Sequence, residues 1–529
     1  MYVTRIINFF LTHIDPHFST SHFYFFTAGI LNLAISVFFF QKNKITYSLF
    51  FLFLSGFLLS YFVGTLDNFL CICDEQYHAL VAKNMIENPF KPMLFKNPLL
   101  EYDYKNWTVN HIWLHKQPLF LWQIALSIKL FGLNEIAVRL PSFIMRSLFP
   151  IFVFRIGFIS LNKNVGYIAA VLASTNHFLF ELSAGKFSTD HNDIAFMFYV
   201  TLSFWSLYEY YYSKRKFWIY LIGFFSGCAL LTKWLIGLIV YLAWFMVLVF
   251  ESKKNTYTDI KRWYPFLKSL GITFLIFLPW QIFIFTKYTR EAIYETFHAS
   301  RHFTEVVEGH AGNWWYHFDA IKDIYGSGDI IPYSLLLGFI AYIYNTKREH
   351  KIIALTSVGF VYVFFSIAAT KMKAFTIIVS FFGFIFWGTL LSYFFEKISQ
   401  LIKNSKLFQI LFFLILIYIS ILSINLKNIA MYHFYWSNGY EKKQMECISK
   451  LNEMRLPLKT VVFNSDMSQN GHISVMFYTS YISYGFIPNK DQISMIKQQN
   501  YKIVVIQKDS LPDYILKDND ILKIPCSPK

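Results

Sequence analysis

Charge is scarce in this sequence: Asp, Glu, Lys and Arg make up 15% of the 529 residues, whereas hydrophobic residues make up 55%. A soluble protein of this length needs more charge to cover its surface, so the composition excludes an ordinary water-soluble fold. Apolar runs of about 17–22 residues recur along the chain, and each is long enough to cross a bilayer as a helix. The sequence therefore predicts an all-α polytopic membrane protein.

Motifs of several enzyme classes are also missing. The chain has no Gly-rich phosphate loop, which disfavours an ATPase, and no Ser-His-Asp order, which disfavours a hydrolase. Five cysteines are too few for a disulfide framework, so free or buried thiols are expected. The N-terminus lacks a short apolar core followed by a small-residue cleavage site, so no cleavable signal peptide is expected.

Basic residues outnumber acidic ones, and the net charge is +16. They lie in short clusters between apolar runs rather than in one patch, which is typical of cytoplasmic loops in membrane proteins. We therefore expect no nucleic-acid partner. Membrane lipids and phosphate-bearing lipids fit the excess of positive charge better.

The apolar runs divide the chain into three expected segments. They are an N-terminal extension with an extra span at 22–40 (1–46), a transmembrane domain (47–426) with a large external loop (67–138), and a small external α/β domain (427–529). In the last segment the charge rises and the long apolar runs stop. Residues 460–464 and 501–506 are expected to form short buried strands there.

The topology follows from the positive-inside rule. About twelve spans, with both termini outside, place basic loops such as 214–216 and 347–348 on the cytoplasmic face. The apolar stretch 119–131 is short for a span, and counting it as one would invert this arrangement. We therefore expect an interfacial helix there. The acidic pair Asp74-Glu75 then lies on the external face.

Polar residues from five separate loops gather near that face in this topology. They are Asp74, Glu75, Tyr77, His115, Lys116, Arg139, Asp190, Asp193, Lys233, Arg301, His302, Glu308, His310, Lys371 and Lys373. The acids suit a general base or a cation-positioning role, and the basic residues suit a phosphate or diphosphate. A phosphate at membrane depth indicates a lipid-phosphate substrate.

Simpler interpretations of these residues stay open. Helix capping would explain the acidic pair and Asp190. Snorkelling to lipid head groups would explain Lys116, and a solvated charge pair would explain Lys371 and Lys373.

The two histidines of the later loop, His302 and His310, also have two interpretations. They suit either a metal site or ordinary loop positions with satisfied ring nitrogens. The sequence requires no cofactor, and a divalent cation is compatible with the acids and histidines but is not demanded by them.

Six motifs in a fixed order carry a family resemblance. They are Asp74-Glu75; His115-Lys-Gln-Pro118 with Arg139-Leu-Pro-Ser142; Ser188-Thr-Asp190; Leu230-Leu-Thr-Lys233; Val307-Glu-Gly-His-Ala-Gly-Asn-Trp-Trp-Tyr316; and Ala369-Thr-Lys-Met-Lys373. The chain thereby resembles the polytopic glycosyltransferases of the GT-C fold. It is more closely similar to the branch with the lipid A 4-amino-4-deoxy-L-arabinose transferase and the protein O-mannosyltransferases.

Three departures from the family pattern accompany the resemblance. Gln117 replaces the first proline of a Lys-Pro-Pro segment, and Trp234 replaces the glycine after Leu-Thr-Lys. The extra span at 22–40 precedes the usual first one.

The resemblance implies a chemistry and a set of roles. A sugar on a polyprenyl phosphate is the donor, an acceptor attacks the anomeric carbon with inversion, and lipid phosphate leaves. Asp74 is then the candidate base, Glu75 a positioning or cation-binding group, and Asp190 the second acid. The remaining site residues are assigned to substrate binding, and the lysines and arginines among them to the lipid phosphate. They are Tyr77, His115, Lys116, Arg139, Lys233, Arg301, His302, His310, Lys371 and Lys373.

The expected function is thus a membrane glycosyltransferase of the inner (plasma) membrane, with its active site on the periplasmic or external face. The acceptor is a lipid such as lipid A, a protein or a surface glycan. The alternative is a lipid-phosphate or glycan transporter without transfer chemistry. Such a transporter should carry charges along a path through its spans, whereas these acids lie on one side.

Overall fold

The computed structural model describes residues 18–526 except 73, 188, 251–259, 327, 403, 438, 468–469 and 509. The chain divides into two compact units. The first contains Met1–Gly64 and Ser142–Ile429, and the second contains Thr65–Pro141 and Ala430–Lys529. The second unit thus joins the long loop near the N-terminus to the C-terminal segment. The sequence had suggested that these were separate parts.

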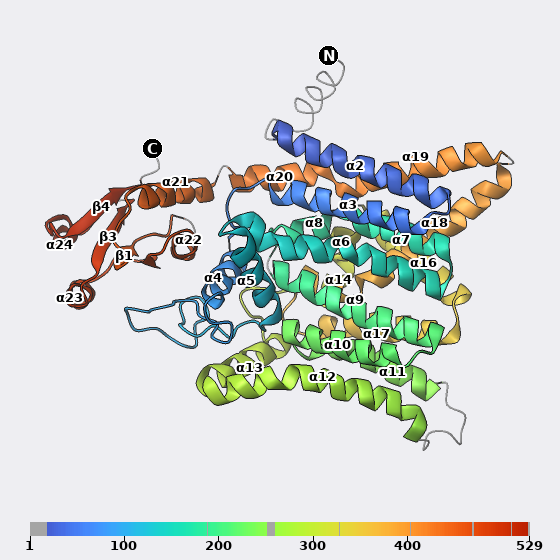
Figure 1. Cartoon of the computed structure of the whole chain (residues 1–529), viewed down its shortest axis with the longest axis horizontal. Helices are drawn as coiled ribbons and strands as arrows, with labels where there is room; N and C mark the ends of the chain where they lie inside the picture. Colours follow the sequence, from blue (N-terminus) through green and yellow to red (C-terminus); the bar gives the residue numbers. More distant parts are fainter. Residues whose placement is uncertain are drawn as a thin grey trace, which may run out of the picture. The chain divides into compact units, whose positions relative to one another are not determined.

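The first unit is built from helices (Figure 1). They are α2 (Thr20–Gln41), α3 (Ile45–Gly64), α6 (Glu135–Ser160), α7 (Lys163–Ser174), α8 (His177–Ser183), α9 (Asp190–Ser213), α10 (Phe217–Lys233), η1 (Leu235–Leu238), α11 (Ile239–Phe250), α12 (Ile260–Lys287), α13 (Thr289–Thr304), α14 (Tyr316–Asp319), α15 (Ile321–Tyr325), α16 (Ile330–Asn345), α17 (Arg348–Ile367), η2 (Lys373–Val379), α18 (Ser380–Leu401), α19 (Ser405–Ile424) and α20 (Leu426–Ser437). The start of α6 and the end of α20 belong to the second unit.

Length and apolar composition identify the helices that could cross a membrane. In the described residues, 7 helices are long and apolar enough to span a bilayer, or up to 9 if each of two bent pairs is one span. The extra span expected at 22–40 is among them, as α2. The chain is therefore a multi-pass helical membrane protein.

The expected count of about twelve spans is not confirmed. The segments 217–233 and 235–250 form apolar helices shorter than 18 residues. The stretch expected to span at 167–182 is broken, because α7 ends at Ser174 and α8 continues at an angle of 49°. Hydropathy alone does not show where a helix will bend.

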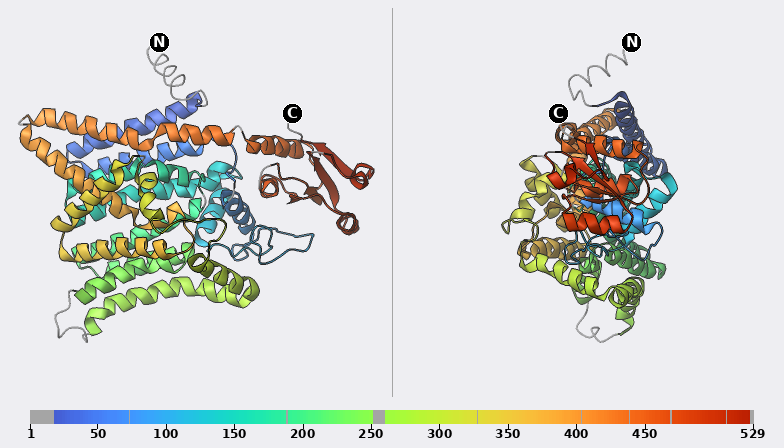
Figure 2. Two further views of the ribbon diagram at one scale, coloured as in Figure 1. Left: turned by 180° about the vertical axis from the view of Figure 1, so that it is seen from behind. Right: turned by 90° about the vertical axis from the view of Figure 1, so that its left-hand side faces the viewer.

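The helices of the first unit pack side by side, both as consecutive pairs and as pairs distant in the chain. Helices α2 and α3 lie side by side, and α10 lies between α9 and α12 (Figures 1 and 2). Where α6 meets α7, a Cβ on Gly157 would come within 2.8 Å of the Gly166 Cα, so only glycine allows this approach. The buried Arg146 joins three helices, because it donates to the Gly56 carbonyl, the Ser60 hydroxyl and the Ser174 carbonyl.

The second unit combines helices with a small sheet. Its elements are α4 (Asp74–Met85), α5 (Leu119–Phe131), α21 (Tyr440–Glu453), β1 (Thr460–Phe463), α22 (Gly471–Tyr478), β2 (Ile482–Tyr484), α23 (Lys490–Gln498), β3 (Lys502–Gln507), α24 (Asp513–Leu516) and β4 (Ile521–Pro525). The four strands are parallel, in the order β2-β1-β3-β4. Val462 pairs with Ser483 and Val504 across the sheet. The strands expected at 460–464 and 501–506 are β1 and β3.

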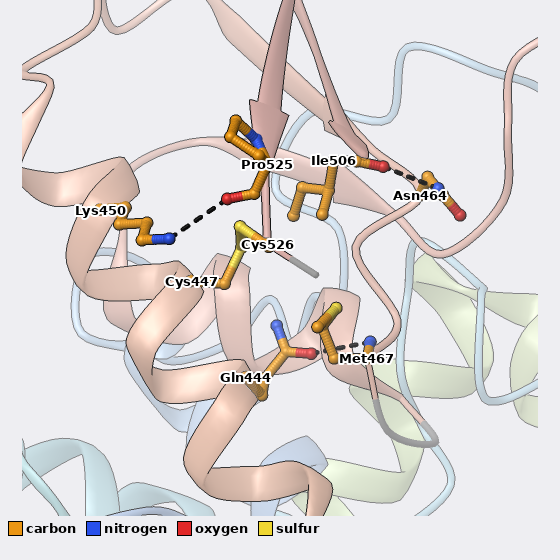
Figure 3. Close-up of a disulfide and its surroundings, with 8 residues drawn as sticks. All are labelled: Gln444, Cys447, Lys450, Asn464, Met467, Ile506, Pro525 and Cys526. Atoms are coloured by element: carbon orange, nitrogen blue, oxygen red, sulfur yellow. Dashed lines mark hydrogen bonds between the residues drawn. A yellow bond between two sulfur atoms is a disulfide. The ribbon is translucent and has the colours of Figure 1, made fainter. Parts of the chain in front are cut away.

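A disulfide links Cys447 on α21 to Cys526 after β4 (Figure 3). Beside it, Gln444 accepts a hydrogen bond from the Met467 amide and Lys450 donates one to the Pro525 carbonyl. The expectation of free or buried thiols is wrong for these two cysteines. Their separation of 79 residues gives no local signal, and only the fold brings them together.

Candidate active site

The acidic pair forms the first turn of α4. Acids are favoured there because the helix N-terminus carries partial positive charge, so this position agrees with the capping interpretation as well. The two side chains differ in environment: Asp74 is half-buried, whereas Glu75 is fully buried.

Glu75 belongs to a buried ion pair with Arg139, which lies near the start of α6. The Arg139 Nε and Nη2 atoms are 2.7 and 2.9 Å from the two Glu75 carboxylate oxygens, and neither side chain is exposed. Arg139 also donates to the carbonyls of Asp67 and Phe69, and the Cys71 amide donates to Glu75. The expectation that Arg139 contacts the phosphate is therefore wrong. Its donors hold Glu75 and the chain that leads into α4.

Aromatic rings surround the next site residues. The Tyr77 ring lies 4.8 Å from that of Trp107, and the Trp107 and His115 rings stack at 4.6 Å. The buried Tyr77 hydroxyl donates to the Asn470 side chain over 3.0 Å. Tyr77 and His115 thus share one aromatic cluster in the second unit.

Lys116 follows this cluster and is half-buried. Within the described part of the chain, its ammonium has neither a hydrogen-bond partner nor an ion-pair partner. A partly desolvated cation without an acid beside it favours an anionic ligand.

The sequence did not reveal a second hydrogen-bond network in this unit. Tyr478, on α22, donates to the Glu135 carboxylate over 2.6 Å and accepts from the Leu70 amide. These contacts connect the C-terminal segment to the chain before α4 and to the start of α6. These contacts could not be predicted from the sequence, because they join residues several hundred positions apart and nothing in the sequence distinguishes Tyr478 from other tyrosines.

The first unit has its own polar cluster, at the start of α9 and the end of α10. The Lys233 ammonium lies 2.5 Å from the Asp193 carboxylate, which also accepts a hydrogen bond from Thr189. Asp190 is buried and accepts from the His191 amide. Ser188, the first residue of that motif, lies outside the described residues.

Backbone geometry at Trp234 bears on one departure from the family pattern. Trp234 follows Lys233 with φ of 41°, a region that favours glycine. The family's glycine would take this conformation without strain, whereas here a tryptophan is held in it. Thr189, just before Asp190, has φ of 69°. Thr189, just before Asp190, and Trp234, just after Lys233, are thus both strained. Strained backbone of this kind is typical of a functional site.

Buried neighbours that the sequence did not single out complete this cluster. The Ser142 hydroxyl lies 2.8 Å from the His191 Nδ1, and Asn192 donates to the Thr232 carbonyl. Both contacts are buried, so they fix the start of α9 against α6 and α10.

The later loop residues lie together in the first unit. The Lys371 amide donates to the His310 carbonyl and the Thr370 amide to the His302 carbonyl. The Lys371 ammonium donates to the carbonyls of Phe365, Ser366 and Ala368 at the end of α17. The expectations that Lys371 is solvated or binds phosphate are therefore wrong, because Lys371 is buried and caps a helix.

Two further cations of this region have acidic partners. Arg301 pairs with Glu305 at 2.8 Å, and Lys373 pairs with Asp323 at 2.6 Å. Both pairs are about half exposed, so each contributes little to stability and each cation can exchange its partner. Of the six cations assigned to phosphate, Lys116 is thus the one left without a partner in the described chain.

Metal ligation was left open for the acids and histidines. In the ranges that the structure describes, no three His, Cys, Asp or Glu side chains are grouped so that they could hold a metal ion.

Comparisons with known proteins bear on this site. Residues 115–283 match the model of the dolichyl-phosphate-mannose-protein mannosyltransferase family. This stretch contains Lys116, Asp190 and Lys233 but neither Asp74 nor His310. An uncharacterized protein of Aquifex aeolicus (strain VF5) is 28% identical over 177 residues, which are 33% of this chain and 32% of the relative. The match thus spans about a third of that relative.

Two solved structures share the fold. ArnT from Cupriavidus metallidurans bound to undecaprenyl phosphate matches with a TM-score of 0.62 and 12% identity, over 85% of this chain and 87% of that one. The oligosaccharyltransferase AglB from Archaeoglobus fulgidus, in complex with an inhibitory peptide and a dolichol-phosphate, matches with a TM-score of 0.55 and 12% identity, over 84% and 65%. The resemblance to the polyprenyl-phosphate-sugar-dependent glycosyltransferases of the GT-C fold is therefore confirmed, in sequence over residues 115–283 and in fold over most of the chain.

Proposed function

We propose that this protein transfers a sugar from a polyprenyl-phosphate donor to an acceptor on the external face of the plasma membrane, with inversion at the anomeric carbon. The fold that it shares with a transferase bound to undecaprenyl phosphate supports a lipid-phosphate donor. No nucleotide is needed, because the bond between the sugar and the phosphate supplies the free energy of transfer.

Asp74 is the proposed base. It is half-buried at the start of α4, whereas its neighbour Glu75 is occupied by Arg139. A carboxylate can accept the proton of an acceptor hydroxyl, or orient the acceptor, as the new bond forms. Glu75 then positions Asp74 through the fold of the chain around it rather than by reacting itself.

Lys116 is the proposed contact of the leaving phosphate. The observation that carries the proposal is that its ammonium has no partner among the described residues. Negative charge on the phosphate grows as the glycosidic bond breaks. A fixed cation in a partly desolvated site stabilises that charge more in the transition state than in the bound donor. Lys116 also lies within the stretch that matches the mannosyltransferase family.

The cluster at the start of α9 gives the first unit a second acid. Asp190 is buried, and the Asp193–Lys233 pair holds charge beside it. We assign Asp190 to orientation of a substrate hydroxyl. Lys233, which pairs with Asp193, is assigned to substrate binding in the first unit. Arg301 and Lys373, each in an exchangeable surface pair, are further candidates for binding a substrate anion in this unit, with His302 and His310 as polar neighbours on that loop.

The disulfide supports the external placement. Disulfides persist in oxidising compartments such as the bacterial periplasm and are rare in the cytosol. Cys447 and Cys526 lie in the unit that also carries Asp74 and Lys116. The sequence likewise predicts an external position for residues 67–138 and 427–529.

The direct test uses purified protein and polyprenyl phosphate that carries a radiolabelled sugar. A transferase moves the label to an acceptor from a membrane extract, whereas a transporter leaves the donor intact. Mass spectrometry of lipids, glycoproteins and surface glycans from cells with and without the gene then identifies the acceptor class. Intact donor in every fraction would overturn the proposed function.

A further inference from the structure

A cavity of about 470 Å³ lies within the second unit. Its walls come from α4, the loop after it, the turn after α5, and the segment between α22 and β2. Its volume suits a small ligand or a head group. Lys116 is not among its lining residues, so the cavity is separate from the proposed phosphate contact.

The cavity carries excess positive charge. Two lysines, Lys83 and Lys96, line it together with one acid, Glu87. Lys83 donates to the carbonyls of Met476, Phe477 and Thr479 over 2.7–2.8 Å. These carbonyls are uncharged, and in the described chain Lys83 has no carboxylate partner.

Lys96 and Glu87 form a pair that a ligand can open. Their charged atoms lie 2.6 Å apart, and their side chains are 47% and 63% exposed. Such an exposed pair contributes little to stability. The Lys96 ammonium can therefore leave Glu87 and contact an incoming anion. Ser480 and Asn97 also line the cavity and supply neutral donors.

The cavity has an apolar side at the end of α5. Ile128 and Leu133 line it, and Leu133 is 41% exposed. Leu130 and Phe131, which come just before Leu133 in the chain, are 66% and 61% exposed. Helix α5 is too short to cross a bilayer, so this apolar face suits acyl chains at the membrane interface.

We infer that this cavity binds the phosphate head group of an anionic phospholipid, with the acyl chains lying along Leu133 and the exposed side chains before it at the end of α5. The phosphate contacts Lys96, and Lys83 adds positive charge from the wall. Phosphate with an attached apolar chain matches both features, the charge and the adjoining apolar face. The site differs from the proposed donor contact, and its occupancy does not depend on sugar transfer.

The experiment measures binding to the full-length protein in detergent. The probes are short-chain phosphatidylglycerol, the matching zwitterionic phosphatidylcholine, and inorganic phosphate. We expect phosphatidylglycerol to bind at least about tenfold more tightly than either of the others. Equal affinity for the two lipids would overturn the charge selectivity. Inorganic phosphate that binds as tightly as phosphatidylglycerol would overturn the lipid part.

A matched pair of variants separates the site from general lipid adhesion. Lys96→Gln should weaken phosphatidylglycerol binding by about tenfold, whereas Glu87→Gln should strengthen it, because Lys96 loses its competing partner. Both side chains are exposed, so both variants should fold. Phosphatidylglycerol affinity that is the same in both variants as in the unaltered protein would overturn the proposed site.

Discussion

The guanidinium of Arg139 holds the Glu75 carboxylate through two hydrogen bonds of 2.7 and 2.9 Å, with both side chains fully buried. Neither charge reaches water, so each depends on the other. The adjacent acids of this motif therefore differ in environment. Glu75 fixes the chain that enters α4, and Asp74 is the acid that we propose for the chemistry.

Removing one partner of this pair should destabilise the protein. Glu75→Gln leaves the Arg139 charge buried without its counterion, at a cost of about 3–5 kcal/mol. We expect a lower thermal midpoint in detergent than for the unaltered protein. The control is Asp74→Asn, one residue earlier, which should leave the midpoint nearly unchanged. Equal midpoints for Glu75→Gln and the unaltered protein would show that the ion pair is not needed for the fold.

Lys116 should determine the donor requirement. Lys116→Ala removes an ammonium that has no ion-pair partner in the described part of the chain, and we expect KM for the polyprenyl-phosphate donor to rise by about tenfold or more. Lys116→Arg should retain much of the activity, because the charge remains. Lys105→Ala, at an exposed lysine of the same loop, is the matched control. An unchanged donor dependence in Lys116→Ala would count against the phosphate contact.

The disulfide should be detectable in the protein from cells. After denaturation, a thiol-reactive polymer should label two more cysteines with prior reduction than without it, because Cys447 and Cys526 are linked. Replacing both by serine should lower the free energy of unfolding by about 2–5 kcal/mol. Equal labelling with and without reduction would contradict the disulfide, and with it the support for an oxidising compartment.

Binding of phosphatidylglycerol should depend on pH through Lys83. Burial, with a smaller effect of Lys96, lowers the pKa of Lys83 to about 8. As the pH rises from 7 to 9, Lys83 loses its proton, so the cavity loses positive charge and affinity should fall several-fold. The other charged groups lining the cavity are Lys96 and Glu87. In Lys83→Met this dependence should disappear, and a flat profile in the unaltered protein would contradict the assignment.

Much of the fold was predictable from apolar length. The runs at 22–40 and 47–66 became α2 and α3, and the short stretch at 119–131 became α5. The break between Ser174 and His177 was not predictable, because hydropathy does not record the bend that packing imposes. The grouping of residues 65–141 with the C-terminal segment depends on contacts between distant parts of the chain, such as Tyr478 with Glu135.

The candidate site was predictable in its residue types but not in its partners. Motif order drew attention to Asp74, Lys116 and the Asp190 region. Motif order could not show that Arg139 forms an ion pair with Glu75 or that Lys371 caps α17, because both contacts depend on how the side chains are buried. Spacing identifies which charges lie near one another, whereas their availability to a ligand follows only from packing.

We propose that Asp74 activates or orients the acceptor while Glu75 maintains the fold. The most direct test of this proposal is transfer of labelled sugar from polyprenyl phosphate by purified Asp74→Asn protein whose thermal midpoint matches that of the unaltered protein. We predict loss of transfer by at least about a hundredfold, in the range typical of removing a general base. Full transfer activity in that folded variant would contradict the account.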